Sequence, residues 1–301
     1  MAKLGDYTAW ANVPDNLKTK TQLGKIGLKP AKGQKPAADF ESHFYGKSRP
    51  RFYDLYDMSE AVEKRKPSEA QLEALAKARE AAKIAQTCKR CNEFAGWRRM
   101  RRDGFCIRCH RERRAEATAA EWLAAEPLFL DTETTGLDAG AEIVEIGVIG
   151  ADGEILLDTL VKSTIPIPAE VTAIHGISDA DVAGAPSFAE LAPRLRELFT
   201  DRLIVIYNAE FDEQMLQQSA TAHELDKFEL QSQCAMSLYA EWWGDYSDYH
   251  QSYTWQSLGS VLSQCDLTVA GDMHRAAADA EACRQVVRYL AAKATNQIEL
   301  D

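Results

Sequence analysis

Short apolar runs, separated by turns or amphipathic stretches, fill the chain from about residue 127 onward. Three runs rich in Leu, Ile and Val predict successive strands at 126–132, 142–150 and 154–162. Further along, the pattern predicts a helix at 187–199, a buried strand at 203–208, and helices at 209–220, 257–265 and 274–294. Three strands followed by helical crossovers indicate an α/β fold in which helices flank a sheet.

The first part of the chain has a different pattern. Residues 1–58 are rich in Lys, Gly and Pro and show little apolar periodicity, so we expect a basic, extended or partly disordered arm. Residues 66–86 predict a helix, with Pro67 in its first turn and Lys or Arg toward its end. We therefore expect three regions: the arm at 1–58, a helix with a cysteine-rich module and a linker helix at 59–126, and the α/β domain at 127–301.

Four of the seven cysteines form two pairs, Cys88 with Cys91 and Cys106 with Cys109, in a C-x2-C-x14-C-x2-C arrangement. Thiolates two residues apart on a tight turn can both reach one ion, and two such turns make the tetrahedral sulfur site that zinc prefers. An iron–sulfur centre and incidental thiols are the alternatives. Because a closed four-sulfur site leaves no open position for a substrate, we expect one structural Zn2+ here.

The formal charge of −11 hides a division between the two parts of the chain. Residues 1–127 carry 26 Lys and Arg against 17 Asp and Glu, a net charge of +9. Residues 128–301 carry 9 against 29, a net charge of −20. The first part is therefore a candidate surface for a polyanion, whereas the second needs bound cations to accept one.

Arginines cluster between and after the cysteine pairs. Residues 88–114 carry ten Lys or Arg against three acids, and the segment WRRMRR contributes Arg98, Arg99, Arg101 and Arg102. One interpretation is a solvated charged face; the other is a finger that contacts phosphates. The same cluster, with the Lys-rich arm, could also dock on a protein or ribonucleoprotein partner.

Five polar residues of the acidic region are candidates for one site. Asp131 and Glu133, two positions apart on a predicted strand, point to the same face of the sheet. Asp212 lies near the start of the next predicted helix, and His274 and Asp279 lie at the start of the last one. Clustered carboxylates repel each other unless some bind protons or cations. Two divalent cations about 3.5 to 4 Å apart would remove that repulsion.

Taken alone, each of these residues has a structural interpretation, such as a helix cap for Asp212. Together, the segments DTETTG, YNAEFD and HRAAAD, in this order, resemble the three motifs of the DEDDh (DnaQ-like) 3′→5′ exonuclease family. The likeness covers about 127–294 and is strongest to the exonuclease X and polymerase III ε types. It implies a ribonuclease H-like fold, with a mixed five-stranded sheet flanked by helices. Tyr207 departs from the His that ε-like members often carry at this position.

The resemblance implies a role for each site residue. Asp131, Glu133, Asp212 and Asp279 would ligate two Mg2+ or Mn2+ ions, which prefer oxygen donors. His274 would be the general base that takes a proton from the attacking water. Residues five apart lie about 140° apart around a helix. His274 and Asp279 therefore cannot share a helical face, and we expect His274 on the loop that precedes the helix.

Four further residues are candidates for substrate contacts. Leu137 and the backbone of Thr134 resemble the family's contacts to the terminal base and the 3′ hydroxyl, and Gly136 lies between them. His175, in the segment IHGI, is either a substrate contact or a packed core residue. The aromatic segment 242–255 could stack bases, seal the core or meet another subunit, and of these we favour core packing.

The resemblance implies a metal-dependent 3′→5′ exonuclease that acts on nucleic acid with a free 3′ end, and we favour single-stranded DNA or DNA ends as its substrate. Trimming of RNA 3′ ends is the closest alternative, and a catalytically idle binding or recruitment subunit is another. No apolar run approaches the roughly 18 residues of a membrane helix. The first ten residues lack the pattern of a signal peptide, so we expect a cytoplasmic protein without membrane contact.

Overall fold

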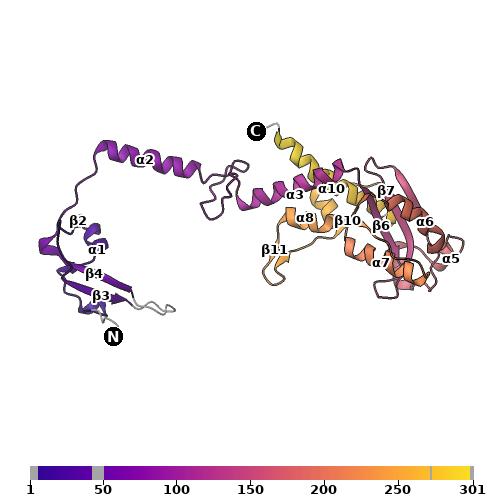
Figure 1. Cartoon of the computed structure of the whole chain (residues 1–301), viewed down its shortest axis with the longest axis horizontal. Helices are drawn as coiled ribbons and strands as arrows, with labels where there is room; N and C mark the ends of the chain where they lie inside the picture. Colours follow the sequence, from indigo (N-terminus) through magenta and orange to yellow (C-terminus); the bar gives the residue numbers. More distant parts are fainter. Residues whose placement is uncertain (1–5, 43–50, 272, 299–301) are drawn as a thin grey trace. The chain divides into compact units, whose positions relative to one another are not determined.

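The computed structural model describes residues 6–42, 51–271 and 273–298. Its contacts divide the chain into two compact units, residues 1–82 and 83–301. Both are drawn in Figure 1, the first in indigo and purple and the second from purple through magenta and orange to yellow. Among the described residues, no helix is both long enough and apolar enough to cross a membrane.

The first unit contains a small sheet. Its elements are η1 (Trp10–Asn12), β1 (Leu17–Lys18), α1 (Lys20–Lys25), β2 (Leu28–Lys29), β3 (Ala38–Ser42), β4 (Arg51–Asp57), η2 (Met58–Glu60), β5 (Val62–Glu63) and α2 (Glu69–Ile84), whose last residues extend past the division between the units. Strand β4 pairs antiparallel with both β1 and β3. A capping box between Thr19 and Gln22 begins α1.

The expectation of an extended or partly disordered arm at 1–58 is wrong for the described residues of that range. Leu17, Leu23, Phe40 and Leu55 are buried and come from four different elements. These positions are six to seventeen residues apart, on elements of two to seven residues, so no window of the sequence shows a helical or strand periodicity. The pairing that buries them is not local and could not be predicted from local pattern.

The helix predicted at 66–86 is confirmed as α2. None of its residues is buried, and the side chains of Leu72, Leu75 and Ile84 are exposed. The helix is exposed to solvent, and its charged residues Glu73 and Lys77 form an ion pair one turn apart.

The second unit has an α/β architecture. Its strands are β6 (Leu128–Thr134), β7 (Ile143–Ile149), β8 (Ile155–Leu160), β9 (Leu203–Ile206), β10 (Gln231–Cys234), β11 (Tyr246–Ser247) and β12 (Ser252–Tyr253). Its helices are α3 (Ile107–Ala124), α4 (Ala169–His175), α5 (Asp179–Val182), α6 (Phe188–Phe199), α7 (Ala209–Ala222), α8 (Ala235–Trp243), α9 (Leu258–Cys265) and α10 (Ala276–Ile298). Every strand and helix predicted after residue 126 is present. The pattern missed β10, α8 and the shorter elements.

Five strands form a mixed sheet in the order β10-β9-β6-β7-β8. Strands β10, β9 and β6 are parallel, while β7 pairs antiparallel with both β6 and β8. Strand β7 is buried along its whole length, which explains why it is apolar on both faces except at Glu145. The predicted five-stranded mixed sheet flanked by helices is confirmed.

Each face of this sheet has its own hydrophobic core. Helices α6 and α7 cover one face, where Leu128, Leu130 and Ile146 meet Leu195 and Met215. Helices α3, α8, α9 and α10 cover the other. Figure 1 shows α10 and α3 on the side of the sheet opposite α6. Burial on both faces fixes the strand register, because a one-residue slip would turn apolar side chains to the wrong face.

Helix α3 begins at the second cysteine pair and ends in this core, where Ala115 and Ala119 are buried. It packs against α8 and α10. The contacts divide the chain between Ala82 and Lys83. The domain boundaries expected at 58/59 and 126/127 stay predictions. The cysteine module belongs to the same compact unit as the sheet.

Candidate active site and cysteine cluster

Asp131 and Glu133 lie on β6, on the face that α10 covers. In the antiparallel pairing with β7, Asp131 lies opposite Gly147, and Glu133 lies opposite Glu145. The register shifts between Glu133 and Thr134, where a bulge interrupts the regular ladder. The strand therefore presents both predicted carboxylates just before the bulge.

Asp212 lies in the first turn of α7 and is buried. Parallel pairing between β6 and β9 ends at Leu130 opposite Ile206, and the chain then enters α7 through Asn208, whose φ is +116°. This places Asp212 beside the end of β6, where its carboxylate accepts a hydrogen bond of 2.7 Å from the Thr132 hydroxyl. The structure thus brings a third predicted acid to the same strand.

His274 and Asp279 approach Glu133 from the start of α10. His274 lies on the preceding loop, as predicted, in a left-handed conformation with φ of +64°. Side-chain ligand atoms of Glu133, His274 and Asp279 lie within 4.8 Å of one another. Among the described residues, the buried Oδ1 atom of Asp279 has no hydrogen-bond partner. A buried acceptor without a donor is costly unless a cation or a proton satisfies it.

The carboxylates of this cluster have a strong tendency to bind protons or cations. Burial, followed by the charges of Asp212, Asp279 and Glu133, raises the pKa of Asp131 well above its ordinary value. Burial is also the main cause that raises the pKa of Glu133 to about 8 and that of Asp212 to about 7. Burial likewise raises the pKa of Asp279. Hard divalent cations with oxygen ligands fit this donor set.

Two charged residues of the site were missed by sequence reasoning. The buried carboxylate of Glu145 accepts hydrogen bonds from Arg275, whose Nε lies 3.0 and 3.1 Å from the two carboxylate oxygens. It also accepts the backbone N–H of Ala276 at 2.9 Å. Glu145 therefore fixes the residue that follows His274 and the first residue of α10. Arg275 stands beside the predicted histidine, but its partner follows only from the register of β6 and β7.

Gly147 lets α10 lie directly on the sheet. A Cβ atom at this position would lie 2.5 Å from the carbonyl carbon of Ala276 and 2.7 Å from the Cα of Ala277. Any larger residue would therefore displace the backbone at the start of α10. This close contact fixes the distance of α10 from the sheet, and with it the positions of His274 and Asp279 relative to Glu133.

The predicted substrate contacts differ in exposure. The Leu137 side chain is 82% exposed. The Thr134 hydroxyl donates a hydrogen bond of 2.7 Å to the carbonyl of Gly136, which closes the turn after β6. His175 is buried: its Nδ1 accepts the N–H of Ile177 at 3.0 Å, and its Nε2 lies 3.2 Å from the carbonyl of Thr134. With both nitrogens engaged, His175 favours the packed-core alternative, in which it supports the end of β6.

The four cysteines of the two pairs converge. Their Sγ atoms lie within 4.8 Å of one another, and the N–H groups of Cys106 and Cys109 donate to Sγ of Cys88 and Cys106. Burial raises the pKa of the Cys88 thiol. Hydrogen bonds from the N–H groups of Cys91, Cys106 and Arg90 outweigh burial and lower this pKa to about 6. The cluster has the donor set of a tetrahedral zinc site.

Two groups of arginines in the cysteine module differ in their partners, while Arg111 and Arg113 lie over aromatic rings. Arg90, Arg108 and Arg114 form ion pairs with glutamates. In the described part of the chain, the second group forms no ion pair and is exposed: it comprises Arg98, Arg99, Arg101 and Arg102. This second group is free to contact an external anion.

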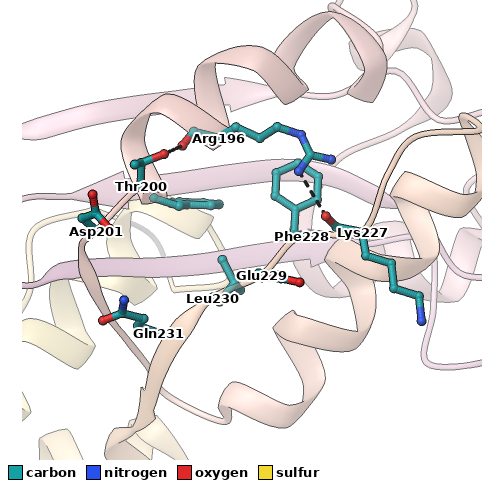
Figure 2. A pocket seen from close by; sticks show the side chains of 9 residues that line it. Arg196, Thr200, Asp201, Lys227, Phe228, Glu229, Leu230 and Gln231 are labelled. Atoms are coloured by element: carbon teal, nitrogen blue, oxygen red, sulfur yellow. Dashed lines mark hydrogen bonds between the residues drawn. The ribbon is translucent and has the colours of Figure 1, made fainter.

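A cavity of about 580 Å³ lies apart from the carboxylates, between the end of α6 and the start of β10. Figure 2 shows Arg196 over the ring of Phe228, with its guanidinium hydrogen-bonded to the carbonyl of Lys227. None of the predicted site residues lines this cavity. The cavity forms no part of the candidate site.

Comparisons with known proteins agree with this geometry. A family model described as "Exonuclease" (RNase_T) matches residues 128–287. The protein named "Uncharacterized exonuclease CP81" of Escherichia phage 186 is 41% identical over 182 residues, which cover 58% of this chain and 92% of that protein.

Two further proteins are similar to this chain, one over a shorter segment and the other with a low TM-score. The DNA polymerase III subunit epsilon of Rickettsia conorii is 37% identical over 91 residues, 28% of this chain and 40% of that protein. A solved structure titled "Exonuclease X in complex with 5′ overhanging duplex DNA" is 27% identical, with a TM-score of 0.41, and covers 53% of this chain and 88% of that one.

Proposed function

The chain belongs to the RNase_T exonuclease family, with a ribonuclease H-like fold, and on this premise we propose that it is a divalent-metal-dependent 3′→5′ exonuclease. We propose single-stranded DNA or DNA ends as its substrate. The observation that carries the proposal is the approach of Glu133, His274 and Asp279 to within 4.8 Å, beside Asp131 and Asp212. The charges of Asp212, Asp279 and Glu133 act on Asp131, which supports the proposal that the DEDDh residues form one site.

The carboxylates fit a pair of divalent cations. The Oδ1 atom of Asp279, which has no hydrogen-bond partner among the described residues, and the raised pKa values of Asp131 and Glu133 fit oxygen ligands of a divalent cation. Asp131, Glu133, Asp212 and Asp279 would hold two Mg2+ or Mn2+ ions. Bound there, the ions would offset the charge of the phosphate and lower the pKa of a water molecule.

His274 has the position of a general base. It stands on a loop with its ring at the carboxylate cluster, so it can take a proton from a water molecule directed at the phosphorus atom. Arg275, clamped by Glu145, restrains the neighbouring backbone. The histidine is thereby held near Glu133 without itself being part of the helix.

The cysteine module would supply the grip on the nucleic acid. Residues 128–301 carry a net charge of −20 and need help to hold a polyanion. The exposed arginines Arg98, Arg99, Arg101 and Arg102 would contact phosphates of the strand, supported by a structural Zn2+ on the four cysteines. A protein or ribonucleoprotein partner for the same arginines is the alternative.

The test uses DNA and RNA oligonucleotides labelled at the 5′ end, with Mg2+, Mn2+ or EDTA. The proposal predicts a ladder of products shortened one nucleotide at a time from the 3′ end. The ladder should disappear with EDTA and with the Asp131→Ala/Glu133→Ala variant. Faster shortening of RNA would indicate the RNA-trimming alternative. Intact oligonucleotides under every condition would leave a binding or recruitment subunit.

A further inference from the structure

An aromatic hairpin, residues 244–255, follows α8 and is exposed to solvent. Strands β11 and β12 pair with Tyr246 opposite Tyr253, and their rings meet edge to face at 5.3 Å. Tyr249 is 90% exposed and Trp255 is 65% exposed. Core packing, which we expected for this segment, is therefore wrong for these rings. It holds for Trp242, which packs on Tyr239 just before the hairpin.

Helix α3 anchors the hairpin on one side. The guanidinium of Arg111 lies 5.4 Å from the centre of the Tyr253 ring. Gly244 has a φ of +83°, and a Cβ there would overlap the same guanidinium, so the close approach requires glycine. Two residues further along α3, Arg113 lies over the ring of Phe105 in the cysteine module. One helix thus holds both the module and the hairpin.

The other end of the hairpin is tied to the candidate active site. The Tyr207 hydroxyl donates a hydrogen bond of 2.8 Å to the carbonyl of Gln256, the residue after Trp255. Tyr207 directly precedes Asn208, the N-cap of α7, and Asp212 lies in the first turn of that helix. The exposed rings therefore begin next to the segment that carries one of the site carboxylates.

The composition of the hairpin determines what it can bind. Residues 244–255 contain three Tyr, one Trp, one His and two Asp, but no Lys or Arg. The hairpin therefore offers ring faces and not cations, and Asp245 and Asp248 disfavour a phosphate lying directly on it. Every base has a face that can stack on an aromatic ring.

We propose that the aromatic hairpin is a stacking platform for unpaired bases of the strand whose 3′ end enters the carboxylate cluster. The inference rests on the proposed exonuclease function and narrows its substrate to single-stranded 3′ ends. Bases stack on Tyr249 and Trp255, while the exposed arginines of the cysteine module hold phosphates further along the strand. A blunt duplex keeps its bases paired and stacked on each other, so it gains nothing from the platform.

Binding measured with zinc-loaded protein and no added Mg2+ or Mn2+ tests the platform separately from cleavage. The full chain is titrated into a fluorescein-labelled single-stranded oligonucleotide of about 20 nucleotides, and into a blunt duplex of the same sequence. Tyr249→Ala/Trp255→Ala should weaken single-strand binding by about 10- to 100-fold and duplex binding by much less. The control Phe52→Ala removes an exposed ring of the first unit and should change neither affinity.

Unchanged single-strand affinity of the double variant would overturn the platform, and so would equal losses for the single strand and the duplex. Sedimentation of the wild type and the double variant tests for a second copy of the chain on the hairpin. That alternative predicts a dimeric wild type, a monomeric double variant and an unchanged single-strand affinity. Wild-type hydrolysis of the p-nitrophenyl ester of thymidine monophosphate with Mn2+ tests the proposed function separately. Without that hydrolysis, a loss of single-strand affinity would still support the platform while the exonuclease proposal failed.

Discussion

Glu133 of β6 and Glu145 of β7 lie directly opposite each other in the antiparallel register, yet they have different partners. Glu145 is bound by Arg275 and by the N–H of Ala276, whereas Glu133 lies with His274 and Asp279. One glutamate therefore fixes the start of α10, and the other is available to a cation. These different partners explain how two acidic side chains can lie opposite each other in one sheet.

Replacing Glu145 should disturb the site without touching the proposed ligands. Glu145→Gln removes the charge that holds Arg275, and losing a buried charged hydrogen bond costs about 1–3 kcal/mol of unfolding free energy. We expect a lower melting temperature and a kcat reduced by about tenfold or more, because His274 loses its restraint. Thermal melts and steady-state kinetics at 25 °C measure the two effects.

Glu197→Gln is the matched control, since Glu197 pairs with Arg194 on the exposed surface of α6. Loss of that pair should change the unfolding free energy by less than about 1 kcal/mol. If Glu145→Gln behaved like this control in both stability and kcat, the positioning role of Glu145 would be wrong.

The carboxylate cluster should make the cation-free protein less stable as pH rises. Burial raises the pKa of Glu133 from 4.5 to about 8 and that of Asp212 from 3.8 to about 7 in the folded chain. Between these ordinary and folded values the folded state binds more protons than the unfolded state, so the free energy of unfolding falls as pH rises. In EDTA we expect a lower melting temperature at pH 8.5 than at pH 6.

Asp131→Asn/Glu133→Gln should reduce this pH dependence, because the amides do not titrate. Mn2+ should restore the wild type at pH 8.5, since a ligand that binds only the folded state stabilises it. A melting temperature in EDTA that rises between pH 6 and 8.5 would contradict the electrostatics described for this cluster.

The exposed arginines of the cysteine module should set the salt dependence of binding. Replacing Arg98, Arg99, Arg101 and Arg102 with Ala should weaken binding of single-stranded DNA. Each lost phosphate contact should also flatten the plot of log K against log salt by about 0.7. Lys77→Ala/Arg79→Ala/Lys83→Ala removes three cations from α2 and serves as the charge control. Equal slopes for the wild type and the four-arginine variant would indicate that these arginines face a protein partner.

Zinc should be a structural component of the second unit. Because Cys106 is the N-cap of α3, and α3 packs in the core, loss of the ion should destabilise this whole unit. Elemental analysis should find about one zinc per chain, as for a single four-cysteine site. Cys88→Ser should lose the zinc and melt at a lower temperature, while Cys234→Ser, outside the cluster, should keep it. Zinc-free protein with unchanged melting would point to incidental thiols.

Local sequence pattern predicted the parts of the site that local geometry determines. The two-residue period of a strand placed Asp131 and Glu133 on one face, and the helical period placed His274 on a loop. The partnership of Glu145 with Arg275 depends on the register of β6 and β7 and on a helix 130 residues away, which no local window contains. The same limit applies to the fold of residues 6–42 and 51–58, in which Leu17, Leu23, Phe40 and Leu55 are buried from four short elements.

Exposure was the other property that pattern could not supply. The segment 242–255 is rich in aromatic residues, which favoured core packing, and Trp242 does lie in the core. Tyr249 and Trp255, however, face solvent in the hairpin that follows α8. The buried state of His175 likewise became visible only from its contacts with Thr134 and Ile177.

The uptake of Mn2+ tests the central claim most directly. Calorimetric titration of the zinc-loaded chain at pH 8, with thymidine monophosphate present, should show about two Mn2+ ions bound per chain, as in two-metal nuclease sites. Asp131→Asn/Glu133→Gln should abolish this uptake while keeping its zinc. Absence of Mn2+ binding by the wild type, or equal binding by the variant, would contradict the account.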